Sequence, residues 1–366
     1  MKYLFFKSTL IICSVLTFAS CQQDSQTKSQ TEVQNKPELI AETASVIKET
    51  SQVNLYSARK EALIRPLLDR FTEETGVEVN IISSKADALL KRIQSEGINS
   101  PADVLITTDA GRLHRAKTAG IFMPISSETL TSRIPQQLRD SDLTWFGLSI
   151  RLRPIFITDE INPESLTTYQ DLAKEEFKGK ICIRSSSNIY NQSLIASMLE
   201  TNGEDDTLNW AKGLVENFAR QPQGGDRDQI RAAAAGQCSI AIANTYYVAQ
   251  MLAQDEDSAD HQAAKKLSII WPNQNEHGVH ANISGAGVIK TAPNKDNAIK
   301  LIEFLSSDAA QEIYANVNYE YPINNKIKTN DILASWGEFK TDPISLELLG
   351  QNNPKAIKLM DNAGWK

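Results

Sequence analysis

The sequence lacks the short motifs that usually mark an enzyme. It has no Gly-x-x-x-x-Gly-Lys loop for a phosphate, no Gly-x-Ser-x-Gly turn for a nucleophilic serine and no His-Glu-x-x-His zinc helix. Histidine is scarce, with four residues in 366, and the metal-like spacing His277-Gly-Val-His280 has only Glu276 beside it. We predict that the chain is not an enzyme and that both histidines are structural. The rival in this class is a hydrolase that pairs Asp109 with Glu61.

Long apolar runs and an excess of positive charge are also missing. Residues 8–19 form an apolar run after Lys2 and Lys7, but this run is shorter than the roughly 20 residues of a membrane-spanning helix. No second run is long enough to span a membrane. The formal net charge is −7, and it becomes −9 when Lys2 and Lys7 are removed. An acidic surface argues against nucleic acid as a partner.

The N-terminus predicts export followed by lipidation. Residues 1–21 have the order of a signal peptide, with basic residues, an apolar run and small residues before Cys21. The stretch Phe-Ala-Ser-Cys resembles the bacterial lipobox, with Phe18 where leucine is usual. This resemblance implies that Cys21 is acylated and anchors the chain to a membrane in the cell envelope or periplasm, whereas an ordinary cleaved signal peptide is the alternative. Residues 22–52 are polar and contain no aromatic side chain, so we predict a flexible tether.

Cysteine is equally scarce, with four residues in the whole chain. Cys13 lies in the predicted signal peptide and Cys21 is the predicted lipid site, so Cys182 and Cys238 remain. Two cysteines in an oxidising compartment suggest one disulfide. Two free thiols are the alternative, because the sequence does not show whether the two Cα atoms lie within bonding range.

What the sequence does contain is an alternation of strand-like and helix-like segments, which indicates an α/β fold. Residues 53–57, 61–71 and 77–82 read as a β-α-β unit, with Gly76 ending the helix. Residues 102–107 form a short apolar run of the kind found in parallel sheets that are covered on both faces.

The same alternation suggests two lobes. Strand-like segments at 147–157 and 267–271, the latter followed by another at 283–289, bracket a second alternating region and are interpreted as hinge crossings. We therefore predict a first lobe at 53–150, a second lobe at 151–270, and a return of residues 271–366 to the first lobe. We expect a monomer.

A pair of adjacent tyrosines is the most informative feature. Tyr246 and Tyr247 follow a predicted strand and open a predicted helix, with Thr245 as the expected N-cap. In a strand their side chains would point to opposite faces. At a helix start they are about 100° apart, and the helix dipole favours ionised phenolates. Tyr190 follows another predicted strand, at the end where open α/β sheets commonly bind ligands.

Tyrosine ligands point to ferric iron. A free tyrosine has a pKa near about 10, so a phenolate ligand requires a strong cation that displaces the proton. Ferric iron is small, hard and highly charged and prefers anionic oxygen donors, whereas calcium would require carboxylates. A Tyr-Tyr pair taken alone is weak evidence and more often reflects ordinary packing.

Several stretches together resemble the ferric-iron-binding solute-binding proteins of bacterial ABC importers. They are Leu-Tyr-Ser-Ala-Arg-Lys-Glu-Ala at 55–62, Ala-Asp-Val-Leu-Ile-Thr-Thr-Asp-Ala-Gly-Arg-Leu at 102–113, Ser-Ser-Asn-Ile-Tyr-Asn at 186–191, Ala-Asn-Thr-Tyr-Tyr at 243–247 and Asn-Ile-Ser-Gly-Ala-Gly at 282–287. The resemblance implies the type II periplasmic-binding-protein fold, in which two α/β lobes are joined by hinge strands with the ligand cleft between them. It also implies an ABC-importer permease as partner.

By this resemblance, Tyr190, Tyr246 and Tyr247 match the family's metal-binding tyrosines, and Fe³⁺ is the ligand. Many members carry a histidine just after the Tyr-Ser-x-Arg stretch, whereas this chain has Lys60-Glu61 there. That departure favours three tyrosines with a synergistic anion such as carbonate.

Two arginines are the candidates for holding that anion. Arg59 and Arg112 lie where a guanidinium could bind carbonate through paired hydrogen bonds, and Arg112 also lies near a predicted helix start. The alternative with the same fold is a binding protein for a metal-free anion, in which the tyrosines form an aromatic wall and these two arginines hold the ligand.

Overall fold

The computed structural model describes residues 51–366. The predicted signal peptide, Cys21 and most of the predicted tether lie outside these residues. Among residues 51–366, none of the helices combines the length and the apolar character that crossing a membrane requires.

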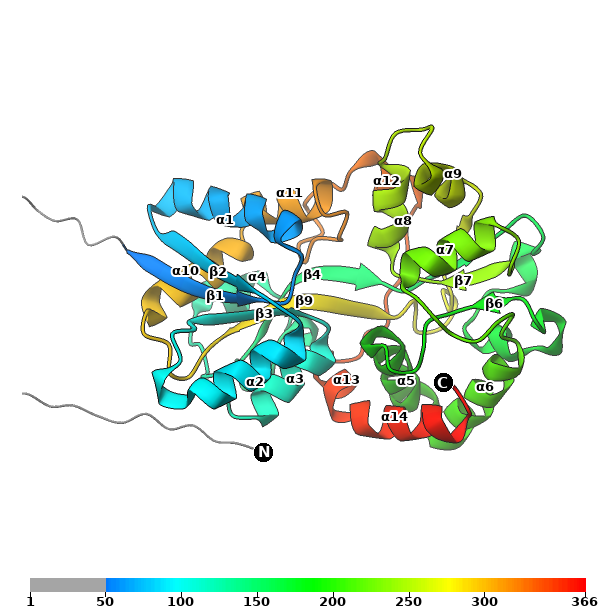
Figure 1. Ribbon diagram of the computed structural model, residues 1–366, viewed down its shortest axis with the longest axis horizontal. Helices are drawn as coiled ribbons and strands as arrows, with labels where there is room; N and C mark the ends of the chain where they lie inside the picture. Colours follow the sequence, from blue (N-terminus) through cyan, green and yellow to red (C-terminus); the bar gives the residue numbers. More distant parts are fainter. Residues whose placement is uncertain (1–50) are drawn as a thin grey trace, which may run out of the picture. The chain divides into compact units, whose positions relative to one another are not determined.

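The first of two sheets has five strands in the order β2-β1-β3-β9-β4 (Figure 1). The strands are β1 (Gln52–Ser57), β2 (Glu78–Ser83), β3 (Val104–Thr108), β4 (Phe146–Leu152) and β9 (Ala281–Val288). β1 pairs in parallel with β2 and β3, as the β-α-β pattern predicts. β9 runs antiparallel to both β3 and β4, so the sheet is mixed rather than parallel throughout. Every residue of β9 is buried.

Helices cover this sheet and, together with it, form what we call the first lobe. They are α1 (Glu61–Thr75), α2 (Ala86–Glu96), α3 (Ala110–Thr118), α4 (Glu128–Arg133), α10 (Lys295–Leu305) and α11 (Asp308–Asn316), with the 3₁₀ turns η1 (Gly97–Asn99) and η2 (Gln136–Leu138). α1 buries Ile64, Leu67, Leu68 and Phe71, which recur at helical spacing. It ends at Gly76, whose φ of 69° suits glycine.

The second sheet has four strands in the order β6-β7-β5-β8. The strands are β5 (Ile155–Ile157), β6 (Ile181–Cys182), β7 (Ile240–Ile242) and β8 (Ser268–Ile270). The surrounding helices are α5 (Ile189–Asn202), α6 (Glu204–Glu216), α7 (Asp226–Ala234), α8 (Thr245–Leu252) and α9 (Ala259–Lys265). The 3₁₀ turns are η3 (Pro163–Ser165), η4 (Gln170–Ala173) and η5 (Glu175–Phe177). β6 and β7 are parallel, and β5 runs antiparallel to β7 and β8. These elements form the second lobe.

Two stretches of chain connect the sheets. The segment 147–157, expected as one strand, is β4 in the first sheet followed by β5 in the second, with a break at Arg153 and Pro154. Proline lacks the N–H that a continuous ladder would need. The return runs from β8 through a loop into β9, and Figure 1 shows β4 and β9 extending from the first sheet toward the second.

The C-terminal segment differs from the expected return of residues 271–366 to the first lobe. α10 and α11 pack on the first sheet, but α12 (Asp331–Ser335) contacts α8, and α13 (Glu347–Gln351) contacts both α3 and α5. α14 (Asn353–Asn362) packs on α5 and α6. Trp365 then donates a hydrogen bond of 3.0 Å from Nε1 to the carbonyl of Arg184. The last residues therefore belong to the second lobe by contact, and the predicted domain boundaries stay a prediction.

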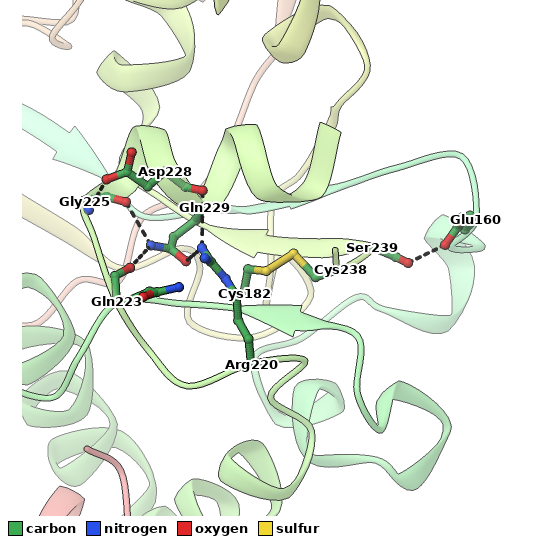
Figure 2. Close-up of a disulfide and its surroundings, with 9 residues drawn as sticks. All are labelled: Glu160, Cys182, Arg220, Gln223, Gly225, Asp228, Gln229, Cys238 and Ser239. Carbon is green, nitrogen blue, oxygen red and sulfur yellow. Dashed lines mark hydrogen bonds between the residues drawn. A yellow bond between two sulfur atoms is a disulfide. The ribbon is translucent and has the colours of Figure 1, made fainter. Parts of the chain in front are cut away.

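Cys182 and Cys238 are joined by a disulfide in the second lobe (Figure 2). Their Cα atoms are 5.9 Å apart, within the usual range for a bridged pair. Cys182 ends β6 and Cys238 lies just before β7, so the bond ties two neighbouring strands together. Beside it, Gln229 donates to the carbonyls of Gln223 and Gly225.

Candidate metal centre

Two helix starts in the second lobe present the three predicted tyrosines. Tyr190 is the second residue of α5, where the Asn188 side chain accepts a hydrogen bond of 3.1 Å from the Tyr190 N–H. Tyr246 and Tyr247 are the second and third residues of α8. The structure places Asn244 rather than Thr245 at the N-cap of α8, so the expected cap was displaced by one residue.

The tyrosines converge although they come from different helices. The hydroxyls of Tyr190 and Tyr246 are 3.5 Å apart, and the ring centroids of Tyr246 and Tyr247 are 4.2 Å apart. All three line a pocket of about 320 Å³. The predicted helix start at Tyr246 and Tyr247 therefore allows both side chains to face one site.

Both lobes contribute to this pocket. The predicted anion-binding residues Arg59 and Arg112 line it from the first lobe, with Lys60 and Lys85. Gln250 joins the tyrosines from the second lobe. The structure therefore brings all five predicted metal-binding and anion-binding residues to a single cleft, while their roles stay predictions.

Three guanidinium groups surround the ring of Tyr190. The guanidinium carbons of Arg151, Arg153 and Arg184 lie 5.4, 5.9 and 5.5 Å from its centroid. Burial raises the pKa of Tyr190, but the positive charge of Arg151 and the hydrogen bond with Tyr246 outweigh burial, so the pKa lies below its ordinary value. Tyr190 is thus the tyrosine whose surroundings most favour a phenolate.

The pKa values of the paired tyrosines, Tyr246 and Tyr247, are shifted in the opposite direction, above the ordinary value. Burial raises the pKa of Tyr246, and the nearby charges of Tyr190 and Tyr247 raise it further. Burial, followed by the charge of Tyr190, also raises the pKa of Tyr247. Three phenolates so close together repel one another, and a cation of high charge removes that repulsion.

The two predicted arginines already have protein partners. Arg59 is 4% exposed, and its Nη1 and Nη2 donate to the Glu320 carboxylate at 3.1 and 3.0 Å. Nη1 also donates to Ser284. Arg112, at the start of α3, donates from Nη1 to Oγ1 of Thr108 at 3.1 Å. Of the two, Arg112 is the less constrained, because Arg59 is held in a buried bidentate ion pair.

Arg151 is the residue that the sequence interpretation missed. It lies on β4, is 2% exposed and lines the pocket. Its Nη2 donates to the carbonyl of Ile283, while Nε and Nη1 have no hydrogen-bond partner within residues 51–366. An arginine as the only charged residue of a largely apolar hinge strand was the available signal, since a buried charge requires compensation.

The other ionisable groups offer no competing metal site. Residues 51–366 contain no group of three or more His, Cys, Asp or Glu side chains arranged to hold a metal. His280 is buried and His277 lies beside Glu276, and neither lines the pocket. Asp87 and Glu320 also line the cleft, but the oxygen donors that converge in it as a set of three are the tyrosine hydroxyls, which as phenolates suit a hard cation.

Comparison with known proteins places this arrangement in a family. A model of the bacterial extracellular solute-binding proteins matches residues 99–338. The chain belongs to this family. Its relatives in the family include iron uptake protein A1 of Synechocystis, which is 49% identical over 319 residues, or 87% of this chain and 88% of the relative. The Fe(3+)-binding periplasmic protein of Serratia marcescens is 27% identical over 316 residues, or 85% of this chain and 89% of the relative.

A solved structure supports the same placement. A Trichodesmium protein in complex with iron and citrate is 50% identical, with a TM-score of 0.83 over 86% of this chain and all of the other. This similarity confirms the predicted type II periplasmic-binding-protein fold. The similar proteins are iron uptake and iron-binding proteins, which agrees with the prediction that the chain is not an enzyme.

Proposed function

We propose that this solute-binding protein captures ferric iron on Tyr190, Tyr246 and Tyr247 and delivers it to an ABC importer. The observation that carries the proposal is the convergence of the three tyrosines, with two hydroxyls 3.5 Å apart, in one cleft among guanidinium groups. Three phenolates balance the charge of one Fe³⁺, and phenolate oxygen is the hard anionic donor that this ion prefers. The names of the relatives supply independent support for iron as the ligand.

We propose further that a synergistic anion, carbonate or a small carboxylate, completes the iron site and that Arg151 and Arg112 hold it. Arg151 supports this role because it lines the pocket and because its buried Nη1 and Nε have no hydrogen-bond partner among residues 51–366; an unpaired buried donor is costly unless a ligand accepts from it. Arg59 is less suited, because both of its terminal nitrogens already bind Glu320.

Hinge closure would link capture to delivery. A ligand can favour the closed form only if it interacts better with that form than with the open one. Tyrosines from the second lobe and Arg112 from the first line the same cleft, so iron and its anion would contact both lobes only when the cleft is closed. The closed, loaded protein is then the form that the importer recognises.

The N-terminal sequence supports a location for this cycle. We propose that the chain works in the periplasm or cell envelope, anchored through acylated Cys21 with residues 22–52 as its tether. The lipobox-like stretch supports this placement. Intact mass spectrometry of the membrane-extracted chain tests it: lipid mass on the wild type that is absent from Cys21→Ala is expected, and an unmodified wild-type N-terminus would contradict it.

The test of iron binding uses the soluble chain that starts after Cys21. The protein is loaded with ferric citrate and bicarbonate and desalted, and its iron content and visible absorption are recorded. We expect one iron per chain with a phenolate-to-iron charge-transfer band, and loss of both in the double variant Tyr246→Phe, Tyr247→Phe.

The matched control is Tyr321→Phe, which removes a hydroxyl that lacks a hydrogen-bond partner in the described part of the chain and lies outside the pocket. It should bind iron like the wild type. A wild-type protein that stays colourless and iron-free overturns the proposal.

The second candidate is a binding protein for a metal-free anion. The unpaired donors of Arg151 and the exposed lysines Lys60 and Lys85 at the pocket favour it. Calorimetry with carbonate, citrate and phosphate, each in the presence of a metal chelator, separates the two. Tight anion binding without metal favours this candidate, whereas anion binding only together with iron favours the ferric site.

A further inference from the structure

Behind the tyrosines, one buried carboxylate contacts three separate segments of the second lobe. Asp226, the first residue of α7, is 1% exposed. Its Oδ1 accepts from Nη1 of Arg153 at 2.9 Å and from the backbone N–H of Asn244 at 3.0 Å. Its Oδ2 accepts from Nη1 of Arg184 at 2.5 Å. Neither Asp226 nor Arg153 is among the residues that line the pocket, whereas the three tyrosines are.

The contact with Asn244 anchors the start of α8. The Asn244 side chain does not cap this helix; instead its Oδ1 accepts from Nη1 of Arg153 at 2.9 Å. Both the backbone and the side chain of the N-cap residue are therefore bound to the Asp226–Arg153 pair. Tyr246 and Tyr247 follow Asn244 by two and three positions. The Asp226–Arg153 pair therefore fixes the position of the helix start that carries both tyrosines.

The contact through Arg153 anchors the start of α5. Nη2 of Arg153 donates to Oδ1 of Asn191 at 2.6 Å, and Asn191 is the residue directly after Tyr190. Asn191 in turn donates from Nδ2 to the carbonyl of Arg184 at 2.8 Å. The fork of Arg153 thus joins α5 and α8, whose tyrosine hydroxyls meet although they are 56 residues apart in sequence.

We propose that Asp226, acting through Arg153, is the positioning residue of the tyrosine site: it holds the starts of α5 and α8 at the separation that lets three phenolates share one cation. This inference deepens the proposed iron-binding function and rests on it. A guanidinium fork suits the task, because its hydrogen bonds have fixed directions. Groups that orient metal ligands in this way commonly change metal affinity about 10–100-fold when they are replaced.

Charge alone predicts the opposite result from positioning. The negative charge of Asp226 repels phenolates, so its neutralisation in Asp226→Asn would strengthen iron binding if charge were its only influence. Loss of positioning weakens binding and lowers the number of phenolates on the metal. The sign of the change therefore separates the two roles.

The experiment compares iron release from Asp226→Asn, Arg153→Lys and the control Asp260→Asn. Arg153→Lys keeps a positive charge beside Asp226 but removes the fork. Asp260→Asn breaks a pair with Arg231, which also lies on α7. Each loaded protein is mixed with excess competing chelator, and the charge-transfer band is followed. We expect release at least about tenfold faster in the first two variants, less charge-transfer absorbance per bound iron, and wild-type behaviour in the control.

Thermal melting of each iron-free protein shows whether it is folded, and if Asp226→Asn does not fold, Arg153→Lys alone decides. Folded variants that release iron within twofold of the wild-type rate, or more slowly, overturn the inference and leave the proposed function standing. Wild-type protein that holds no iron overturns the proposed function and this inference with it.

Discussion

The first lobe faces the pocket with arginines that already have partners, whereas the second lobe faces it with tyrosines that have mainly each other. Arg59 is held by Glu320, and Arg112 by Thr108. On the other side, the Tyr190 and Tyr246 hydroxyls lie against one another, and the guanidinium carbon of Arg151 on β4 lies 5.4 Å from the centroid of the Tyr190 ring. The difference teaches that the candidate metal donors lie on the second lobe, while the first lobe forms a positively charged wall that is held most tightly at Arg59 and less tightly at Arg112.

Breaking the buried ion pair of the first lobe should have the largest effect on stability. Glu320→Gln leaves the Arg59 charge buried without a carboxylate, and we expect a loss of about 3–5 kcal/mol in the free energy of unfolding. Denaturant titration measures it. The double variant Arg59→Met, Glu320→Met should lose much less, because no unpaired charge remains. A single variant as stable as the double one would contradict the idea that the wall depends on this pair.

Removing the disulfide tests the second lobe through the same quantity, the free energy of unfolding. Cys182 and Cys238 close a long loop, with a sequence separation of 56, and the variant Cys182→Ser, Cys238→Ser should lose about 2–4 kcal/mol on unfolding in urea. Because the bond ties β6 to the start of β7, and the tyrosine-bearing helices follow these strands, iron retention should also weaken. Treating the wild type with a reductant should reproduce the loss, and unchanged stability in both experiments would show that packing alone holds these strands.

The most gradual effect concerns pH and the junction between the lobes. Burial, followed by the charges of Arg153 and Arg151, lowers the pKa of His280 to about 3, whereas an unfolded histidine has a pKa near about 6.5. Between these two values the unfolded chain binds one more proton than the folded chain. Stability should therefore fall as the pH falls, with a His280 contribution of about 1.4 kcal/mol per pH unit.

The matched variant for this prediction is His280→Gln. Unfolding free energies of both proteins are measured at several pH values between 7 and 4, and the difference between the two curves isolates the histidine from the carboxylates. The unfolding free energy of the wild type minus that of the variant should fall as the pH falls through this range. Parallel curves would mean that His280 is protonated as easily in the folded protein as in the unfolded one.

Much of the fold could be predicted because its signals are local. The apolar spacing of α1, the glycine at position 76 and the alternation of strands and helices are properties of short stretches, and each produced the expected element. The hinge segment 147–157 was less predictable. Its sequence resembles one continuous strand, whereas in the structure β4 pairs in the first sheet and β5 pairs in the second. The packing of α14 on the second lobe could not be predicted from local signals either, because an amphipathic sequence does not specify which lobe the helix packs on.

In the candidate site, the tyrosines were predictable and the arginines only in part. Ala-Asn-Thr-Tyr-Tyr is a local pattern that places two tyrosines at a helix start, and Tyr190 follows a strand in the same way. The choice among arginines depends on which guanidinium remains unpaired. Arg59 lines the cleft as expected. Its partner Glu320 lies 261 residues away in the sequence, so the residues around Arg59 gave no sign of this ion pair.

By itself the sequence determined the alternation of elements, the ends of helices and the kinds of donor that the chain can offer, because these follow from neighbouring residues and their spacing. Only the tertiary structure decided that Tyr190 meets Tyr246, that Glu320 binds both terminal nitrogens of Arg59, and that Asp226 joins two helix starts. It also decided that Nη1 of Arg151 has no hydrogen-bond partner within the described residues. Each of these depends on contacts between distant segments, and hydrogen bonds and ion pairs select their partners by distance and direction in the folded chain rather than by position along it.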